Sequence, residues 1–95
     1  PNELVLITAA DDPLAAGATV APAQLGGRTW LLREPDSGTR SANEEFLAAH
    51  DLHGDTLTVG SNGAIRQAAR LGLGISFLSA DAVTSDLDAG HIALA

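Results

Sequence analysis

Residues 29–40 read Thr-Trp-Leu-Leu-Arg-Glu-Pro-Asp-Ser-Gly-Thr-Arg, an apolar run followed by a polar turn and the start of an amphipathic segment. The pattern predicts a strand over 29–33 that breaks at Pro35, and a helix over 39–50. The first N–H groups of a helix have no partner within it and carry partial positive charge. With two hydroxyls and a guanidinium nearby, this terminus could hold a carboxylate, sulfate or phosphate.

A simpler structural interpretation of the same turn stays open. Asp36 or Ser37 could cap the helix while Gly38 eases the turn. Arg40 and Glu44 lie one helical turn apart and could form an ordinary surface pair. Caps are far commoner than anion sites, so the wider sequence has to decide between the two.

Composition limits the possible functions. The 95 residues are 45% hydrophobic and 18% charged, as expected of one small globular domain or a piece of a larger protein. No run is long and apolar enough for a membrane span, no leader is recognisable, and the chain reads as a fragment. The absence of cysteine excludes disulfides and thiolate sites. A net charge of −7 argues against a DNA- or RNA-binding surface, because such surfaces neutralise phosphates.

The rest of the chain alternates strand and helix patterns. We expect a short helical turn at 22–25, further helices at 63–71 and 80–87, and strands at 4–7, 56–59, 75–78 and 91–94. This order predicts an α/β fold with a mixed, mostly parallel sheet of about five strands. In such sheets, ligands bind where strands end and helices begin. We therefore expect the junctions at 34–39 and 60–63 to converge at one edge, with Ser37, Thr39, Ser61 and Asn62.

Four segments together resemble one known family. They are Leu4-Val5-Leu6-Ile7 with Asp12-Pro13-Leu14-Ala15, Trp30-Leu31-Leu32-Arg33-Glu34 with Ser37-Gly38-Thr39-Arg40, Gly60-Ser61-Asn62-Gly63-Ala64-Ile65, and Gly72-Leu73-Gly74-Ile75-Ser76-Phe77-Leu78-Ser79. In this order they resemble the effector-binding domain of LysR-type transcriptional regulators. The resemblance implies a two-lobed fold like the type 2 periplasmic binding proteins, with a small effector between the lobes. It also implies a cytoplasmic homo-oligomer that contacts DNA through a separate N-terminal domain.

The resemblance assigns this chain to the second lobe. Residues 1–95 would form a single three-layer lobe, regulatory subdomain II, without the DNA-binding domain and most of the first lobe. The implied effector is small and anionic, and no cofactor is expected. Arg40 would either pair with an effector carboxylate or brace the turn. The implied effector-binding residues are Pro35, Asp36, Ser37, Gly38, Thr39, Arg40, Ser61, Asn62 and Thr8. Gly63 departs from the family, which commonly has a larger residue there.

Two alternatives share this fold: a lobe of a transport solute-binding protein, and a lobe of a prephenate dehydratase-like enzyme. The enzyme would need a buried acid or base near the hydroxyl-rich edge. The nearest carboxylates, Glu34 and Asp36, have the pattern of turn residues, so we expect no enzyme. We also expect no metal site, because the spacing of His50, Asp51, His53 and Asp55 matches no known ligand pattern.

Overall fold

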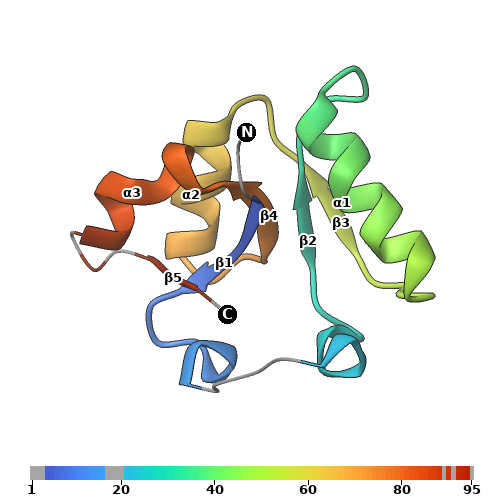
Figure 1. The fold of residues 1–95 in the computed structure, drawn as a ribbon, viewed down its shortest axis with the longest axis horizontal. Helices are drawn as coiled ribbons and strands as arrows, with labels where there is room; N and C mark the ends of the chain where they lie inside the picture. Colours follow the sequence, from blue (N-terminus) through green and yellow to red (C-terminus); the bar gives the residue numbers. More distant parts are fainter. Residues whose placement is uncertain (1–3, 17–20, 89, 91, 95) are drawn as a thin grey trace.

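The fold was analysed in a computed structural model that describes residues 4–16, 21–88, 90 and 92–94. Strands and helices alternate along the chain, as the sequence predicts (Figure 1). The elements are β1 (Leu4–Ala9), the 3₁₀ helices η1 (Pro13–Ala16) and η2 (Pro22–Leu25), β2 (Trp30–Leu32), α1 (Gly38–Ala49), β3 (Thr56–Thr58), α2 (Asn62–Arg70), β4 (Ser76–Ser79), α3 (Ala80–Asp88) and β5 (Ile92–Leu94).

The strands pair in a different way from the predicted mixed, mostly parallel sheet of about five strands. One sheet has the order β4-β1-β5 with both pairs antiparallel, and β2 and β3 form a separate parallel pair. A parallel bridge between Trp30 and Ile75 joins the two sheets. All strands except β1 therefore point the same way. The difference from the prediction lies in β1. This reversed strand lies between β4 and β5, so both of its ladders are antiparallel.

The two sheets separate just after the bridge. Leu31 N–H donates to Ile75 O at 2.8 Å, and Ile75 N–H donates to Thr29 O at 2.9 Å. Beyond Ile75 the chain pairs with β1 instead of β2. The buried Ser76 hydroxyl then donates to Leu31 O at 2.8 Å, so a side chain takes the place of a ladder bond.

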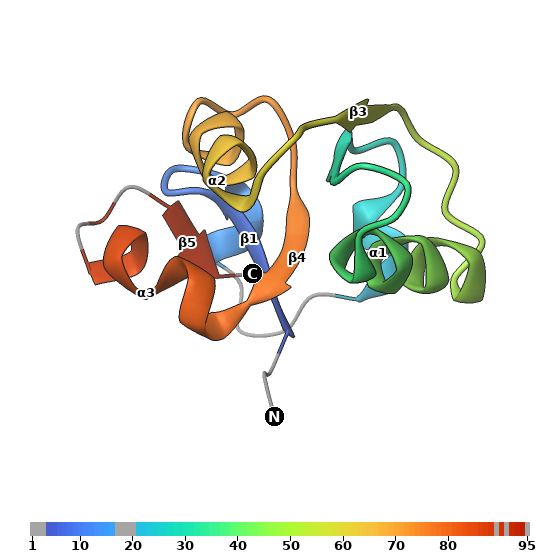
Figure 2. The same cartoon turned by 90° about the horizontal axis from the view of Figure 1, so that it is seen from above.

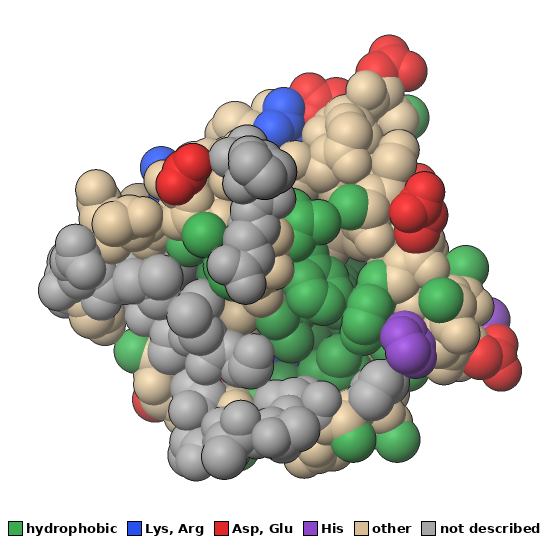
Figure 3. Space-filling model, in the orientation of Figure 1, with side chains coloured by type: hydrophobic (Ala, Val, Ile, Leu, Met, Phe, Trp, Pro, Cys, Tyr) green, Lys and Arg blue, Asp and Glu red, His purple; other side chains and the backbone are tan. Residues whose placement is uncertain are grey.

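Apolar side chains pack on both faces of the central strands. Neighbouring residues of β1 enter different clusters: Ile7 packs with Ile65 and Val83 of α2 and α3, whereas Leu6 packs with Trp30. Figure 2 shows α2 and α3 beside β1, β4 and β5, and α1 packs against β2 and β4. In Figure 3, hydrophobic side chains fill the middle of one face and acidic side chains lie at its margin. Burial on both faces agrees with the continuous apolar run of β1.

Element ends differ from the predictions by a few residues. Helices α1 and α2 each begin one residue before the predicted start, and β1 continues to Ala9. The 3₁₀ helix η1 was not predicted; the Asp12 carboxylate accepts a bond from Leu14 N–H at 2.9 Å at its start. His91, the first residue of the predicted last strand, lies outside the described residues. None of the helices within the described ranges is long and apolar enough to cross a bilayer.

Candidate functional site

Ser37 caps helix α1. Its backbone is extended, and its hydroxyl oxygen accepts from Thr39 N–H at 3.2 Å and Arg40 N–H at 3.5 Å. Ser37 N–H donates to Glu34 O at 3.0 Å, which closes the turn after β2. The capping interpretation of this turn is thus present in the structure. Pro35, Asp36 and Gly38 are exposed on the same turn.

Ser61 caps helix α2 in the same way. Its hydroxyl oxygen accepts from Ala64 N–H at 3.0 Å, and α2 begins at the next residue, Asn62. Each of the two serines follows one strand of the parallel β2–β3 pair. Because parallel strands end at the same edge, the amino-terminal ends of α1 and α2 also lie at that edge.

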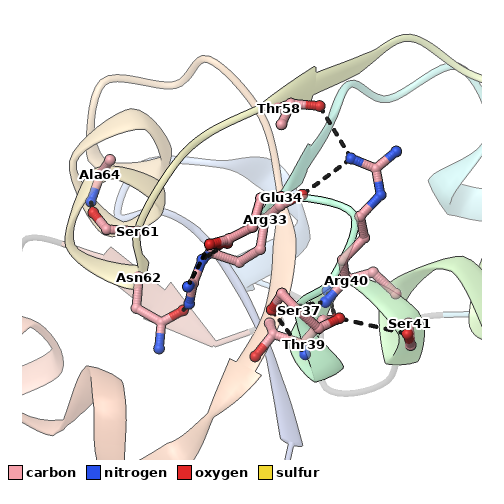
Figure 4. A network of polar contacts seen from close by, with 11 residues as sticks. Arg33, Glu34, Ser37, Thr39, Arg40, Ser41, Thr58, Ser61, Asn62 and Ala64 are labelled. Atoms are coloured by element: carbon pink, nitrogen blue, oxygen red, sulfur yellow. Dashed lines mark hydrogen bonds and ion pairs between the residues drawn. The ribbon is translucent and has the colours of Figure 1, made fainter.

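Arg33 connects the two junctions (Figure 4). Its Nη1 donates to Asn62 Oδ1 at 2.8 Å, across 29 residues of sequence. Its Nε and Nη2 donate to the two carboxylate oxygens of Glu34 at 2.6 and 3.2 Å. The structure therefore brings the predicted junctions together through Arg33, which was not among the predicted site residues. The available signal was a charged residue directly after the buried strand β2.

Arg40 extends to the other side of the same turn. Its Nη1 donates to Arg33 O at 3.0 Å and to Thr58 Oγ1 at 3.2 Å. Its Nε lies 3.3 Å from Glu44 Oε2, so the predicted surface pair is formed as well. With these three acceptors, Arg40 braces β2, β3 and α1, which is one of the two roles left open by the sequence. Figure 4 shows the Arg33 and Arg40 side chains pointing in different directions.

Thr8 lies apart from the other candidates. It is fully buried, and its hydroxyl donates to Ala9 O at 3.0 Å. The register places Leu4 opposite Ser79, at the end of β4, and Ile7 opposite Ser76, at its start. Because β1 runs opposite to β2, β3 and β4, its last residues lie at the edge away from the two helix starts. The antiparallel direction of β1 thus removes Thr8 from the site.

At this edge the cationic side chain of Arg33 is covered by the more exposed carboxylate of Glu34. The Arg33 side chain is 22% exposed and that of Glu34 is 46% exposed. The hydrogen bond from the Arg33 side chain is the main cause that holds the pKa of Glu34 below its ordinary value of 4.5. The site therefore contains an ionised carboxylate already seated on a guanidinium.

The histidine and aspartate residues near the end of α1 are not arranged as a metal site. His53 Nε2 lies 2.6 Å from Asp51 Oδ1, and both side chains are almost fully exposed. The His50 ring packs against Phe46 with the ring centroids 4.5 Å apart. Within the described part of the chain, no three His, Cys, Asp or Glu side chains gather as a metal site.

Comparison with known proteins gives the family. Residues 1–95 match the LysR substrate binding domain over the whole chain. The chain belongs to the LysR family. This LysR domain is 38% identical over 94 residues to the RuBisCO operon transcriptional regulator of Acidithiobacillus ferrooxidans, and 35% identical over 95 residues to the HTH-type transcriptional regulator CbbR of Rhodospirillum rubrum. These matches cover 98% and 99% of this chain, but only 30% and 31% of the relatives.

A solved structure supports the same conclusion. The regulatory domain of CcmR from Synechocystis PCC6803, solved in complex with 2-PG, aligns with a TM-score of 0.90 and 34% identity. The alignment covers 98% of this LysR domain and 45% of the CcmR chain. The relatives are transcriptional regulators, which favours the regulator hypothesis over the transport and enzyme alternatives.

Proposed function

We propose that this LysR domain is one lobe of an effector sensor, and that a small anionic effector binds at the edge where β2 and β3 end. Residues 1–95 would form that single lobe, and a second lobe outside this chain would cover the effector. The proposal rests on the Arg33–Asn62 hydrogen bond, which unites the starts of α1 and α2 beside a guanidinium. Two helix amino termini and a cation make this edge suitable for an anion although the chain carries a net charge of −7.

The proposed contacts come from both helix starts. Ser37, Thr39, Ser61 and Asn62 would contribute hydroxyl, amide and main-chain groups. Pro35, Asp36 and Gly38 would shape the turn, and Arg40 would hold it in place through its bond to Arg33 O. Thr8 is not included, because it is buried at the opposite edge.

Effector binding would act by shifting a population. An effector that contacts both lobes prefers one relative position of the lobes, and it can change the equilibrium only by its difference in affinity. The shift would reach DNA through a helix-turn-helix domain elsewhere in the regulator and through contacts between copies of the protein.

The proposed function is tested with the full-length regulator that contains residues 1–95. We would measure binding of 2-PG by isothermal titration, because the CcmR regulatory domain was solved with that ligand. A band-shift assay on the DNA upstream of the regulator's own gene would follow, with and without ligand. Binding that alters the band shift is the expected result. A protein that binds DNA identically across a panel of anionic metabolites, with no heat of binding, would contradict the proposal.

A further inference from the structure

The Arg33–Glu34 pair suggests how an anionic effector is recognised, and this inference rests on the proposed function. We propose that Arg33 binds the anionic group of the effector, and that Glu34 occupies the guanidinium as an internal substitute until the effector displaces it. The effector class would be small molecules with a carboxylate or phosphate group.

The geometry of the pair is that of anion recognition. Nε and Nη2 of Arg33 approach the two oxygens of Glu34 in parallel, at 2.6 and 3.2 Å. This planar fork is the arrangement by which arginine binds free carboxylates and phosphates. A ligand with the same shape could therefore take the position of the Glu34 carboxylate.

Exposure of the two side chains makes the exchange possible. Glu34 is 46% exposed and Arg33 is 22% exposed, so the carboxylate is the outer partner of the pair. Ion pairs with this much solvent contact contribute little to stability. Displacing Glu34 into water would therefore cost little, while the guanidinium would gain a ligand in its place.

Arg33 remains fixed when Glu34 leaves. Its Nη1 is held by Asn62 Oδ1 at 2.8 Å, and its carbonyl oxygen accepts from Arg40 Nη1 at 3.0 Å. A cation held in this way is preorganised, so less entropy is lost when the ligand binds. Arg40 lacks this fork, because only its Nε contacts the Glu44 carboxylate, and Arg28 is paired with Asp12, which follows β1.

The exchange would also reach both helix starts. Asn62 is the first residue of α2, and Glu34 O accepts from the N–H of Ser37, the cap of α1. An effector on Arg33 therefore replaces a contact that belongs to the α1 turn while the contact to α2 persists. Binding of the anion would therefore be coupled to rearrangement of the 34–38 turn.

The experiment compares Kd values for inorganic phosphate and for 2-PG in the wild type and in four variants. Glu34→Gln should tighten binding about three- to tenfold, because the internal competitor is gone, and Arg33→Gln should weaken it at least about tenfold. Arg33→Lys keeps the charge without the fork and should lie between wild type and Arg33→Gln. Glu45→Gln, an exposed change of the same charge on α1, is the control and should change Kd less than about twofold.

A second measurement does not depend on affinity. The NMR signal of Arg33 Nε–H should shift when phosphate is added to wild type, and should already be shifted in unliganded Glu34→Gln. Equal Kd values for wild type and Arg33→Gln, with both proteins folded, would overturn this inference while leaving the proposed function intact. A wild type that binds neither probe nor any other anion would contradict the proposed function, and this inference with it.

Discussion

Asn43 of α1 binds both backbone groups of Phe77 on β4. Phe77 N–H donates to Asn43 Oδ1 at 2.9 Å, and Asn43 Nδ2 donates to Phe77 O at 3.1 Å and to Thr39 O at 2.9 Å. Asn43 is fully buried. An amide carries both a donor and an acceptor, so it can replace a neighbouring strand. This contact fastens α1 to β4 where the two sheets separate.

Replacing Asn43 with leucine should therefore be strongly destabilising. The side chains are similar in size, but the change leaves the Phe77 N–H without its Asn43 partner, and Phe77 O keeps only the longer bond from the Ser76 hydroxyl, at 3.4 Å. We expect the free energy of unfolding to fall by about 2–4 kcal/mol. Urea unfolding followed by circular dichroism measures this, with Glu45→Gln on the exposed face of α1 as the control. Equal midpoints for wild type and Asn43→Leu would show that the amide carries no stability.

The burial of Asn43 could not be predicted from the sequence. A helix over 39–50 was predicted from its local pattern, and the structure has it at Gly38–Ala49 with Phe46 and Leu47 packed against the core. The inner side also contains a polar residue, Asn43, which is fully buried. Local periodicity predicts which segments form helices and strands. It contains no information about a bond that joins residues 34 positions apart.

In the candidate site, too, local features were predicted and contacts between distant residues were not. The hydroxyl-rich helix starts at Ser37 and Ser61 were predicted because caps have a local signature. The role of Arg33 was missed, since it depends on Asn62, 29 residues later. Thr8 was misplaced because the direction of β1 in the sheet is a property of the topology. A mixed, mostly parallel sheet was predicted from the alternation of strands and helices, which does not say which strand is reversed.

Gly74 should not tolerate a side chain. A Cβ there would lie 2.7 Å from Thr29 O and 3.0 Å from the Leu31 side chain, at the bridge between the two sheets. Gly74→Ala should cost about 1–3 kcal/mol of unfolding free energy, because β2 would have to move. Gly60→Ala is the matched control, since a Cβ at Gly60 meets nothing within 4 Å. Thermal unfolding of the two variants compares them, and the prediction is wrong if both melt at the same temperature.

The Asp12–Arg28 ion pair should make stability sensitive to acid. Partial burial raises the pKa of Asp12, but the hydrogen bond from Arg28, the Leu14 N–H and the charge of Arg28 outweigh it and bring the pKa below the ordinary value of 3.8. The pair therefore contributes stability above pH 3.8, and this contribution is lost as the pH falls through the lower folded-state pKa. Asp12→Asn should remove this part of the pH dependence in urea titrations.

A second carboxylate has to be separated from this effect. The pKa of Glu34 is lowered too, through its hydrogen bond with Arg33, so it adds to the acid sensitivity with the same sign. Glu34→Gln is therefore measured beside Asp12→Asn at neutral pH and at a series of values below 4. If stability of Asp12→Asn falls with acid as steeply as that of the wild type, the Asp12–Arg28 pair is not responsible.

Arg40→Ala should separate bracing from effector contact. As a brace, Arg40 holds Arg33 O and Thr58 Oγ1, so its loss should cost about 1–2 kcal/mol and lower the Tm by several degrees. The folded variant should still bind phosphate within about threefold of the wild-type Kd, because Arg33 keeps its bond to Asn62. Arg70→Ala, at the exposed end of α2, controls for the loss of one positive charge. An unchanged Tm with a loss of affinity of about tenfold or more would instead make Arg40 an effector ligand.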